Sequence, residues 1–508
     1  MEDRRSTSPL LLSLSLFLLV IVTRVPFQSD LLYSMDSVNF ALALDQYSIP
    51  VHQPHPPGYF LYVMLGRLLR PFADDANSAL VSISIVFSAL TVIAIFCLGH
   101  EMYGIETGLI AAAIGITSPN LWFNGEIALT YVTEAFFSTA IALCCWRMRK
   151  GKEVYLWISA LVIALAGGFR QVTPVFLFPL WMYSAKDMPI RRIVLSFCLI
   201  IIASLSWFFP MLRMTGGWEP YYGAFRELVT FHAGNATVFE KGWSVWKSYS
   251  VTLFHFVVIG VGVGIFPLAL SSYMLFRQRR LEVLDREQSL FFSLWAIPST
   301  LFYLLVFIHP ANPGYSLVIM PVFFLLTAQS LAFLCVDLKR FWKKNLYHLL
   351  AVILVLLNAA WFLRSTSPFS YRGILEHKRE LISVLDGIRT FPPESTAIFV
   401  AKPSVFFGYR HIMYYLPDYR VYQIDRRETS TGETRKTYWG ENRETKTTNG
   451  VVLPGRFDEV AILHYGENCE KDFGQDAKRM RVGTSNICLI SGPVPLLKRV
   501  FPGMGFPP

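Results

Sequence analysis

Residues 79–99 read ALVSISIVFSALTVIAIFCLG, an apolar run that contains no charged side chain. At about 1.5 Å of helical rise per residue, such a run crosses the roughly 30 Å of hydrocarbon in a bilayer. Similar runs recur along the chain, which is 53% hydrophobic and only 16% charged. An ordinary soluble protein carries about 25% charged residues. The sequence therefore predicts a polytopic, mostly α-helical membrane protein.

The other apolar blocks are separated by polar connections and give about eleven membrane helices in all. The blocks are 8–25, 79–99, 107–119, 131–146, 154–169, 171–184, 193–212, 247–276, 289–308, 314–336 and 346–363. Several are shorter than the roughly 20 residues that a perpendicular helix needs. We therefore expect shallow or broken helices within 107–146 and 154–184, lined by protein or by a water-filled cavity.

Positive charge is concentrated in the connections between these blocks. Clusters of Arg and Lys precede the first block and follow the fourth, sixth, eighth and tenth, so all of them fall on one side of the membrane. Connections rich in Arg and Lys stay in the cytoplasm. The pattern explains the net charge of +10 without nucleic acid as a partner. It predicts a multi-pass protein of the plasma (inner) membrane with a cytoplasmic N-terminus and exported loops at 26–78 and 213–246.

The chain changes character after the last apolar block. Residues 376–389 alternate charged and apolar positions at helical spacing, and short apolar runs between turn residues are typical of strands. These runs are 397–401, 419–424, 460–463 and 487–490. We predict that residues 364–508 form a small α/β domain, exported to the periplasmic or extracellular side, after a membrane domain of residues 1–363 that includes the loop 26–78.

The tail also contains a polar stretch and two cysteines. Residues 426–450 are polar, with little apolar content, and are predicted to form a mobile loop. Cys469 and Cys488 could form a disulfide in an exported domain or remain free thiols, and the sequence does not favour either.

The first exported loop carries the strongest candidate for chemistry. Asp36 lies soon after the first membrane block, and a carboxylate there can take a proton from an acceptor hydroxyl within hydrogen-bond distance. Asp36 also precedes an apolar run, so for the residue taken alone a helix cap is the simpler interpretation. In the same loop, the prolines after His55 make a rigid segment that could bring His55 to a phosphate or to a carboxylate. Alternatively, the segment only turns the chain and leaves His55 exposed.

Four further candidates lie near the exported ends of apolar blocks. An acid at membrane depth is costly and usually faces a cavity, and Glu134 is the deeper of the two acids here. Glu126 could instead be solvated at the interface. Arg170 follows two glycines and suits an anion such as a phosphate, unless its side chain snorkels to the interface. Tyr315, in the Pro-Gly-Tyr turn that opens the tenth block, could face the same cavity.

The order of these features resembles the GT-C class of polytopic glycosyltransferases. That class includes protein O-mannosyltransferases of the family 39 type, aminoarabinose transferases and the catalytic subunit of oligosaccharide transferase. The loop from Asp36 to His55-Pro-Pro-Gly is similar to the Asp-Glu-x-x-Phe … His-Pro-Pro-Leu-Gly pattern of the O-mannosyltransferases, except that Ser37 replaces the Glu. The stretch 122–131, the Gly-Gly-Phe-Arg segment and the Pro-Gly-Tyr turn also resemble bacterial members, so the likeness covers roughly residues 8–340.

The resemblance implies an inverting, hexosyl- or mannosyltransferase-type enzyme. It would move a monosaccharide from a polyprenyl-phosphate donor to a lipid, glycan or protein acceptor on the exported face. Asp36 would be the general base and His55 would lie by the lipid phosphate. Arg170, the two acids and Tyr315 are candidates for binding the donor by their position alone. No metal or other cofactor is expected, because no set of metal ligands is evident near the histidines of the first loop.

Two other functions fit part of the sequence. A transporter or flippase for a lipid-linked sugar would use the helices together with Glu134 and Arg170, and inverted repeats would favour it. A non-catalytic membrane protein of envelope glycan assembly would work through its tail, and an exposed Asp36 with no cavity beside it would favour that function. The transporter explains the large tail and the first loop poorly, so the transferase is the preferred hypothesis.

Overall fold

A computed structural model describes residues 8–235, 237–278, 285–335, 340–400, 406–428, 434–440, 445–447, 458–463, 477–483 and 485–491. The chain divides into two compact units. The helical unit comprises Met1–Ser29 and Pro56–Gly373, and the sheet unit comprises Asp30–His55 and Ile374–Pro508. This division differs from the predicted domains, because Asp30–His55 of the first loop groups with the tail. The reason is a set of tertiary contacts between that segment and the tail, which sequence patterns do not reveal.

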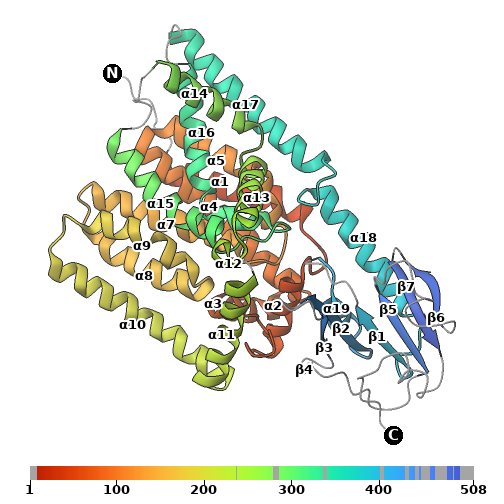
Figure 1. The fold of residues 1–508 in the computed structure, drawn as a ribbon. Coiled ribbons are helices and arrows are strands. Elements are labelled where there is room, and N and C mark those ends of the chain that lie inside the picture. The colour runs from red at the N-terminus through yellow and green to blue at the C-terminus, as the bar shows by residue number, and fades with distance from the viewer. Residues whose placement is uncertain are drawn as a thin grey trace. The chain divides into compact units, whose positions relative to one another are not determined.

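The helical unit follows the predicted apolar blocks (Figure 1). Its main helices are α1 (Pro9–Arg24), α4 (Ala76–Tyr103), α5 (Ile105–Thr117), α7 (Tyr131–Arg149), α8 (Val154–Phe169), α9 (Val172–Ala185), α10 (Ile190–Thr215), α13 (Trp243–Val261), α14 (Ile265–Gln278), α15 (Arg286–Leu305), α16 (Met320–Leu334) and α17 (Arg340–Arg364). Each predicted block contains a helix, but block 247–276 is divided between α13 and α14 by a turn at Gly262–Gly264. In the described part of the chain, six stretches are long and apolar enough to cross a membrane. The prediction of a multi-pass helical membrane protein is confirmed.

The expected short and broken helices are also present. Among the described residues, α5, α8, α9 and α16 are apolar but have only 10–17 residues each. The chain breaks at Ser118 between α5 and the short α6 (Pro119–Gly125). The Ser118 hydroxyl accepts the N–H of Leu121 at 3.3 Å and donates to the carbonyl of Gly260 at 2.6 Å. Protein groups thus replace the helical hydrogen bonds that the break removes.

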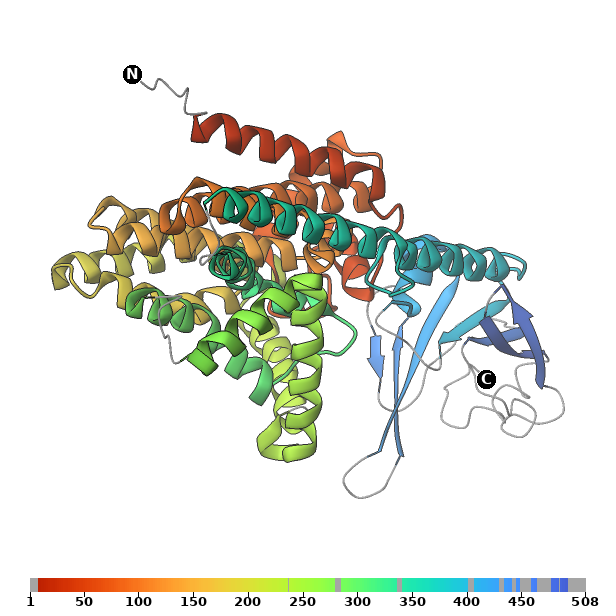
Figure 2. The same cartoon turned by 90° about the horizontal axis from the view of Figure 1, so that it is seen from above.

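Burial distinguishes the inner helices from the lipid-facing ones. In the apolar stretch of α4, 72% of the residues are buried inside the protein, whereas only 11% are buried in that of α10. Helix α4 packs against α1, α5 and α7, and α10 packs along α8 (Figures 1 and 2). A Cβ on Gly99 of α4 would lie 2.9 Å from the Cα of Gly108 of α5, so glycine permits the close approach of these two helices. The apolar face of α10 suits contact with lipid.

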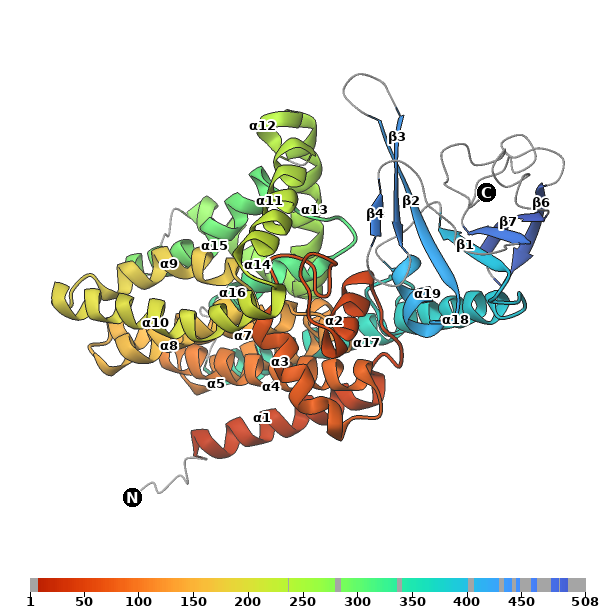
Figure 3. The ribbon, with the colours of Figure 1, turned by 90° about the horizontal axis from the view of Figure 1, so that it is seen from below.

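Other helices lie in the connections between these main helices. They are α2 (Met35–Asp45) in the sheet unit, and α3 (Phe60–Leu69), α6, α11 (Trp218–Asn235) and α12 (Val238–Lys241) in the helical unit. The loop 213–246 is therefore largely helical. In Figure 3, α11 and α12 form a protrusion of the helical unit that leads into α13.

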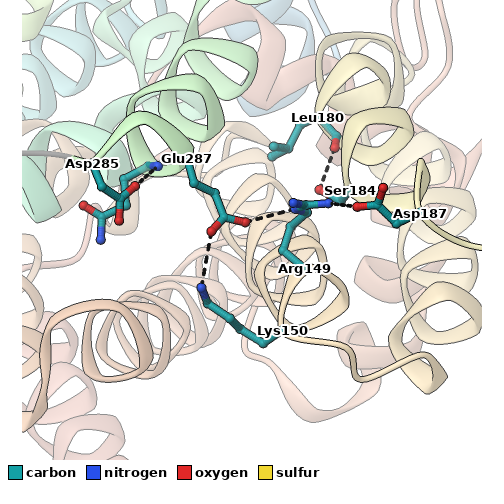
Figure 4. Close-up of polar contacts among 8 residues, drawn as sticks. Arg149, Lys150, Leu180, Ser184, Asp187, Asp285 and Glu287 are labelled. Carbon is teal, nitrogen blue, oxygen red and sulfur yellow. Dashed lines mark hydrogen bonds and ion pairs between the residues drawn. The ribbon is translucent and has the colours of Figure 1, made fainter.

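Charged side chains tie three connections together at one end of the helical unit (Figure 4). Glu287 Oε1 lies 3.0 Å from Arg149 Nε, and Glu287 Oε2 lies 3.4 Å from Lys150 Nζ. Arg149 also pairs with Asp187. Arg149 ends α7, Asp187 follows α9, and Glu287 lies in the first turn of α15. The connections after the fourth, sixth and eighth predicted blocks therefore share one end of the bundle. Their assignment to the cytoplasmic side remains a prediction.

The sheet unit contains a mixed sheet. Among the described residues the strand order is β4-β3-β2-β1-β5-β7-β6, in which β1 pairs in parallel with β2 and β5 and the other pairs are antiparallel. The strands are β1 (Thr396–Val400), β2 (Arg420–Glu428), β3 (Thr434–Gly440), β4 (Thr445–Thr447), β5 (Glu459–Leu463), β6 (Ala477–Val482) and β7 (Ser485–Ser491). The apolar faces of α18 (Tyr371–Ile388) and α19 (Tyr409–Tyr415) share one core with β1, β2, β5 and β7. The predicted small α/β domain is confirmed.

The prediction of a mobile loop at 426–450 is wrong for the residues of this segment that the structure describes. Strand β2 continues to Glu428, and β3 pairs with it in an antiparallel register from Tyr422↔Gly440 to Glu428↔Thr434. Thr, Tyr and Trp, which recur in this segment, favour strands, and an antiparallel ladder needs no continuous apolar face. Cys488 in β7 is disulfide-bonded. Its predicted partner, Cys469, lies outside the described residues.

Candidate functional site

Asp36 lies in the first turn of α2, but it does not cap that helix. Ser34 is the N-cap: its hydroxyl oxygen accepts the N–H of Ser37 at 3.2 Å, and the Ser37 hydroxyl accepts the N–H of Ser34 at 3.3 Å. This reciprocal pair is a capping box. The helix-cap interpretation of Asp36 is therefore wrong, and its carboxylate is left for other contacts.

Asp36 and His55 face each other within the sheet unit. His55 Nδ1 lies 3.4 Å from Asp36 Oδ1, and the His55 ring packs against Phe40 of α2 with ring centroids 5.5 Å apart. The Asp36 side chain is 38% exposed and that of His55 is 20% exposed. The structure thus brings together the two residues that the first-loop motif singled out, and it leaves the carboxylate partly exposed to solvent.

A small turn precedes His55. Ser48 and Gln53 exchange two backbone hydrogen bonds, with Gln53 N–H donating to the Ser48 carbonyl at 2.9 Å. His52, between them, has a φ of +57°, in the left-handed region that few residues adopt. This closed turn, together with the prolines that follow, limits the positions that His55 can take.

Arg170 lies in a buried polar cluster of the helical unit. Its Nε is 2.9 Å from Glu134 Oε2, and its Nη1 donates to Thr130 Oγ1 at 3.2 Å. Thr173 Oγ1 donates to the other oxygen of Glu134 at 3.3 Å. The Arg170 side chain is only 9% exposed and Glu134 is fully buried. Arg170 therefore does not snorkel, and Glu134 faces the protein interior.

Tyrosine rings surround the Arg170 guanidinium. Its Cζ lies 4.4 Å from the ring centroid of Tyr131 and 5.7 Å from that of Tyr315. The two rings meet edge to face at 5.2 Å. A Cβ on Gly314 would lie 2.3 Å from Tyr131 Cγ, so the Pro-Gly-Tyr turn needs its glycine to let Tyr131 reach Arg170. Tyr315, Arg170 and Glu134, predicted from separate segments, thus share one cluster.

The glycines before Arg170 have a packing role. A Cβ on Gly168 would lie 2.4 Å from Leu61 Cδ1 of α3, and a Cβ on Gly167 would lie 3.2 Å from the Trp207 ring of α10. Other side chains of the protein thus occupy the space beside both glycines. They bring α8 close to α3 and α10, and they do not open the backbone to an anion.

Glu126 is buried, so its interpretation as a solvated interfacial acid is wrong. Its Oε1 lies 4.0 Å from Nε of Arg24, and both side chains are fully buried. Arg24 Nη2 donates to the Ile116 carbonyl at 2.7 Å, and its Cζ lies 4.6 Å from the Trp122 ring centroid. The pair ties the end of α1 to the connection between α6 and α7. Sequence reasoning missed Arg24, although a lone Arg that ends an apolar block was a usable signal.

Metal binding has no obvious site in the described residues, since His, Cys, Asp and Glu side chains there do not gather in groups of three or more. The candidate site of the sheet unit is thus the partly exposed Asp36 with His55. That of the helical unit is the buried Arg170 with Glu134, Tyr131 and Tyr315.

These features define a membrane protein with the fold of the GT-C glycosyltransferases. The chain is similar to the crystal structure of ArnT from Cupriavidus metallidurans in the apo state, with a TM-score of 0.59 and 10% identity over 96% of this chain and 98% of that one. It is also similar to ArnT bound to undecaprenyl phosphate, with a TM-score of 0.56 and 9% identity over 96% of this chain and 100% of that one.

A sequence family also matches part of the chain. Residues 44–188 match the family described as the protein O-mannosyl-transferase TMEM260 N-terminal domain. No curated protein sequence matches the chain. The fold expected from the resemblance to GT-C enzymes is confirmed.

Proposed function

We propose that the protein is an inverting glycosyltransferase of the plasma membrane. It moves a monosaccharide from a polyprenyl-phosphate donor to an acceptor hydroxyl on the exported face, with the N-terminus in the cytoplasm. The GT-C fold, the O-mannosyltransferase family match over residues 44–188 and the undecaprenyl phosphate bound by the similar ArnT support this proposal.

In the proposed reaction, Asp36 is the general base. The acceptor oxygen attacks C1 of the sugar from the face opposite the phosphate while its proton passes to the Asp36 carboxylate. The bond between C1 and the phosphate oxygen breaks, and its electron pair leaves with the polyprenyl phosphate. His55, 3.4 Å from Asp36, orients the carboxylate. A positioned base of this kind contributes roughly 10²–10⁴-fold to a rate.

The helical unit supplies the candidates for holding the donor phosphate. Arg170 carries five N–H donors in a fixed plane, of which Nε faces Glu134 and Nη1 faces Thr130. Its remaining donors and the hydroxyl of Tyr315 would bind phosphate oxygens, with Glu134 holding the guanidinium in place. Glu126 is engaged by Arg24, so we assign it to positioning the connection between α6 and α7 instead of to the donor.

One observation carries the proposal: a carboxylate that the helix does not need for its cap stands beside a histidine and is 38% exposed. A carboxylate engaged by the helix cap would be less available to take a proton from a substrate. The geometry of Asp36 therefore fits a general base better than it fits a structural acid.

The test is transfer by the purified full-length protein in proteoliposomes, with radiolabelled polyprenyl-phosphate hexoses and pooled lipid, glycan and peptide acceptors. We expect transfer by the wild type and a loss of about 10³-fold in the Asp36→Asn variant. Asp45→Asn is the matched control, because Asp45 is an exposed acid at the other end of the same helix. Equal activity of wild type and Asp36→Asn, or no transfer from any of these donors, contradicts the proposal.

A further inference from the structure

The segment that carries Asp36 and His55 is held at both ends by one short helix of the tail, α19. At the start of the segment, the backbone N–H of Leu32 donates to the hydroxyl of Tyr415 at 2.9 Å. At its end, Arg410 Nη2 donates to the carbonyl of Val51 at 2.6 Å. Both contacts lie within the sheet unit. A single helix thus contacts the chain on each side of α2.

Arg410 is built into this contact. Arg410 is only 5% exposed, and its Nε donates to the hydroxyl of Tyr409 at 2.9 Å. A buried guanidinium is costly unless it is hydrogen-bonded, and its bonds to neutral acceptors are stronger than ordinary ones. The bond to Val51 therefore fixes the turn between Ser48 and Gln53, which immediately precedes the His55 segment.

Packing reinforces the other end. A Cβ on Gly408, just before α19, would lie 2.3 Å from the sulfur of Met35, so this glycine lets the first residue of α2 pack directly on the tail. Asp30 also forms an ion pair with Lys378 of α18. The start of α2 is therefore anchored by a hydrogen bond, a packing contact and an ion pair.

We propose that α19 clamps the first loop, and that Arg410 is a positioning residue for the Asp36–His55 pair. Arg410 acts through Val51 and the turn, and it does not itself contact the acceptor. The consequence for turnover rests on the proposed function, whereas the clamp itself does not. The tail would then act in the reaction by keeping the base oriented.

The test measures loop dynamics and turnover on the full-length protein in lipid nanodiscs. Hydrogen exchange of backbone peptides covering residues 46–55 should be about tenfold faster in Arg410→Met, because a charge-assisted hydrogen bond is lost. Arg410→Lys, which keeps a donor for Val51, should be intermediate. Arg479→Met is the control, because Arg479 is an exposed arginine on β6 of the same unit. In the transfer assay, kcat of Arg410→Met should fall about tenfold while the donor KM stays within about twofold.

The outcomes separate the clamp from the proposed function. Unchanged exchange at residues 46–55 in Arg410→Met overturns the clamp, and faster exchange with an unchanged kcat overturns the positioning role. If Arg410→Met does not fold, Tyr415→Phe removes the hydroxyl that accepts the Leu32 N–H. Unchanged exchange at residues 30–35 in that variant also overturns the clamp. A wild type without transfer activity contradicts the proposed function alone, because exchange is measured without substrate.

Discussion

Two acid–base pairs of this protein, Asp36 with His55 and Arg170 with Glu134, differ in how far each is buried. Asp36 and His55 are 3.4 Å apart and remain 38% and 20% exposed, whereas Arg170 and Glu134 are 2.9 Å apart and almost entirely buried. A partly exposed pair adds little to stability, but removing one partner of a buried pair leaves an uncompensated charge. The comparison suggests that the first pair is arranged for access by a substrate and the second for a fixed electrostatic environment.

Breaking the buried pair should have the larger effect on stability. Glu134→Ala leaves the Arg170 guanidinium buried without its carboxylate, so we expect a loss of about 3–5 kcal/mol in the free energy of unfolding. Thermal and denaturant unfolding of the full-length protein in detergent would measure it. The Glu134→Ala/Arg170→Met double variant should recover most of this stability. If Glu134→Ala is as stable as the wild type, Arg170 does not depend on Glu134.

Breaking the exposed pair should affect turnover and leave stability nearly unchanged. In His55→Gln we expect kcat to fall about tenfold, because Gln can still contact Asp36 but lacks the imidazole ring that packs on Phe40 and orients the carboxylate. The unfolding temperature should change by less than about 2 °C, since exposed pairs contribute at most about 1 kcal/mol. The transfer assay and thermal unfolding on one preparation check both. A large fall in stability with normal turnover would reverse the roles of the two pairs.

A third pair of titratable residues, His377 and His411, sharpens the comparison because burial keeps both neutral. Burial lowers the pKa of His377 to about 4 and that of His411 to about 3, and the neighbouring His377 adds to the lowering at His411. An unfolded histidine has a pKa near 6.5, so below that pH the unfolded chain binds more protons than the folded one. Stability should therefore be complete above about pH 6.5 and decrease as the pH falls.

Calorimetry of the full-length protein between pH 7.5 and 5.0 would measure this effect. We expect the unfolding temperature to fall by roughly 5 °C over that range. The His377→Gln/His411→Gln variant should lose most of this dependence, because its side chains do not titrate. An unfolding temperature that does not change with pH in the wild type would show that these histidines are not buried as neutral groups.

The sequence was sufficient for the membrane helices and for the residues of the first pair. Apolar blocks must become helices in a bilayer, because only helices satisfy their own backbone there, and α5, α8 and α9 were recognisable as short from their length alone. The His55 segment was recognisable because two prolines follow it. Arg170, Glu134 and Tyr315 stood out because charged and polar groups are rare at membrane depth.

The sequence was insufficient wherever a distant contact decided the outcome. Ser34 caps α2 in place of Asp36. Serines occur at many positions that are not caps, so the residue types of Ser34 and Ser37 alone did not predict the capping box. The contact of Leu32 with Tyr415 joins residues far apart in the chain, so no periodicity predicts that Asp30–His55 belongs with the tail. Beyond the apolar run 419–424, the sequence of β2 and β3 is mostly polar, and their pairing depends on backbone hydrogen bonds that leave no apolar pattern.

The central claim is that Asp36 takes the proton of the acceptor, and one measurement tests it most directly. Polyprenyl-phosphate binding and single-turnover transfer would be measured on the same preparation of Asp36→Asn. The account predicts a dissociation constant for the lipid phosphate within about twofold of the wild type and a transfer rate lower by about 10³-fold. A transfer rate equal to that of the wild type would contradict it.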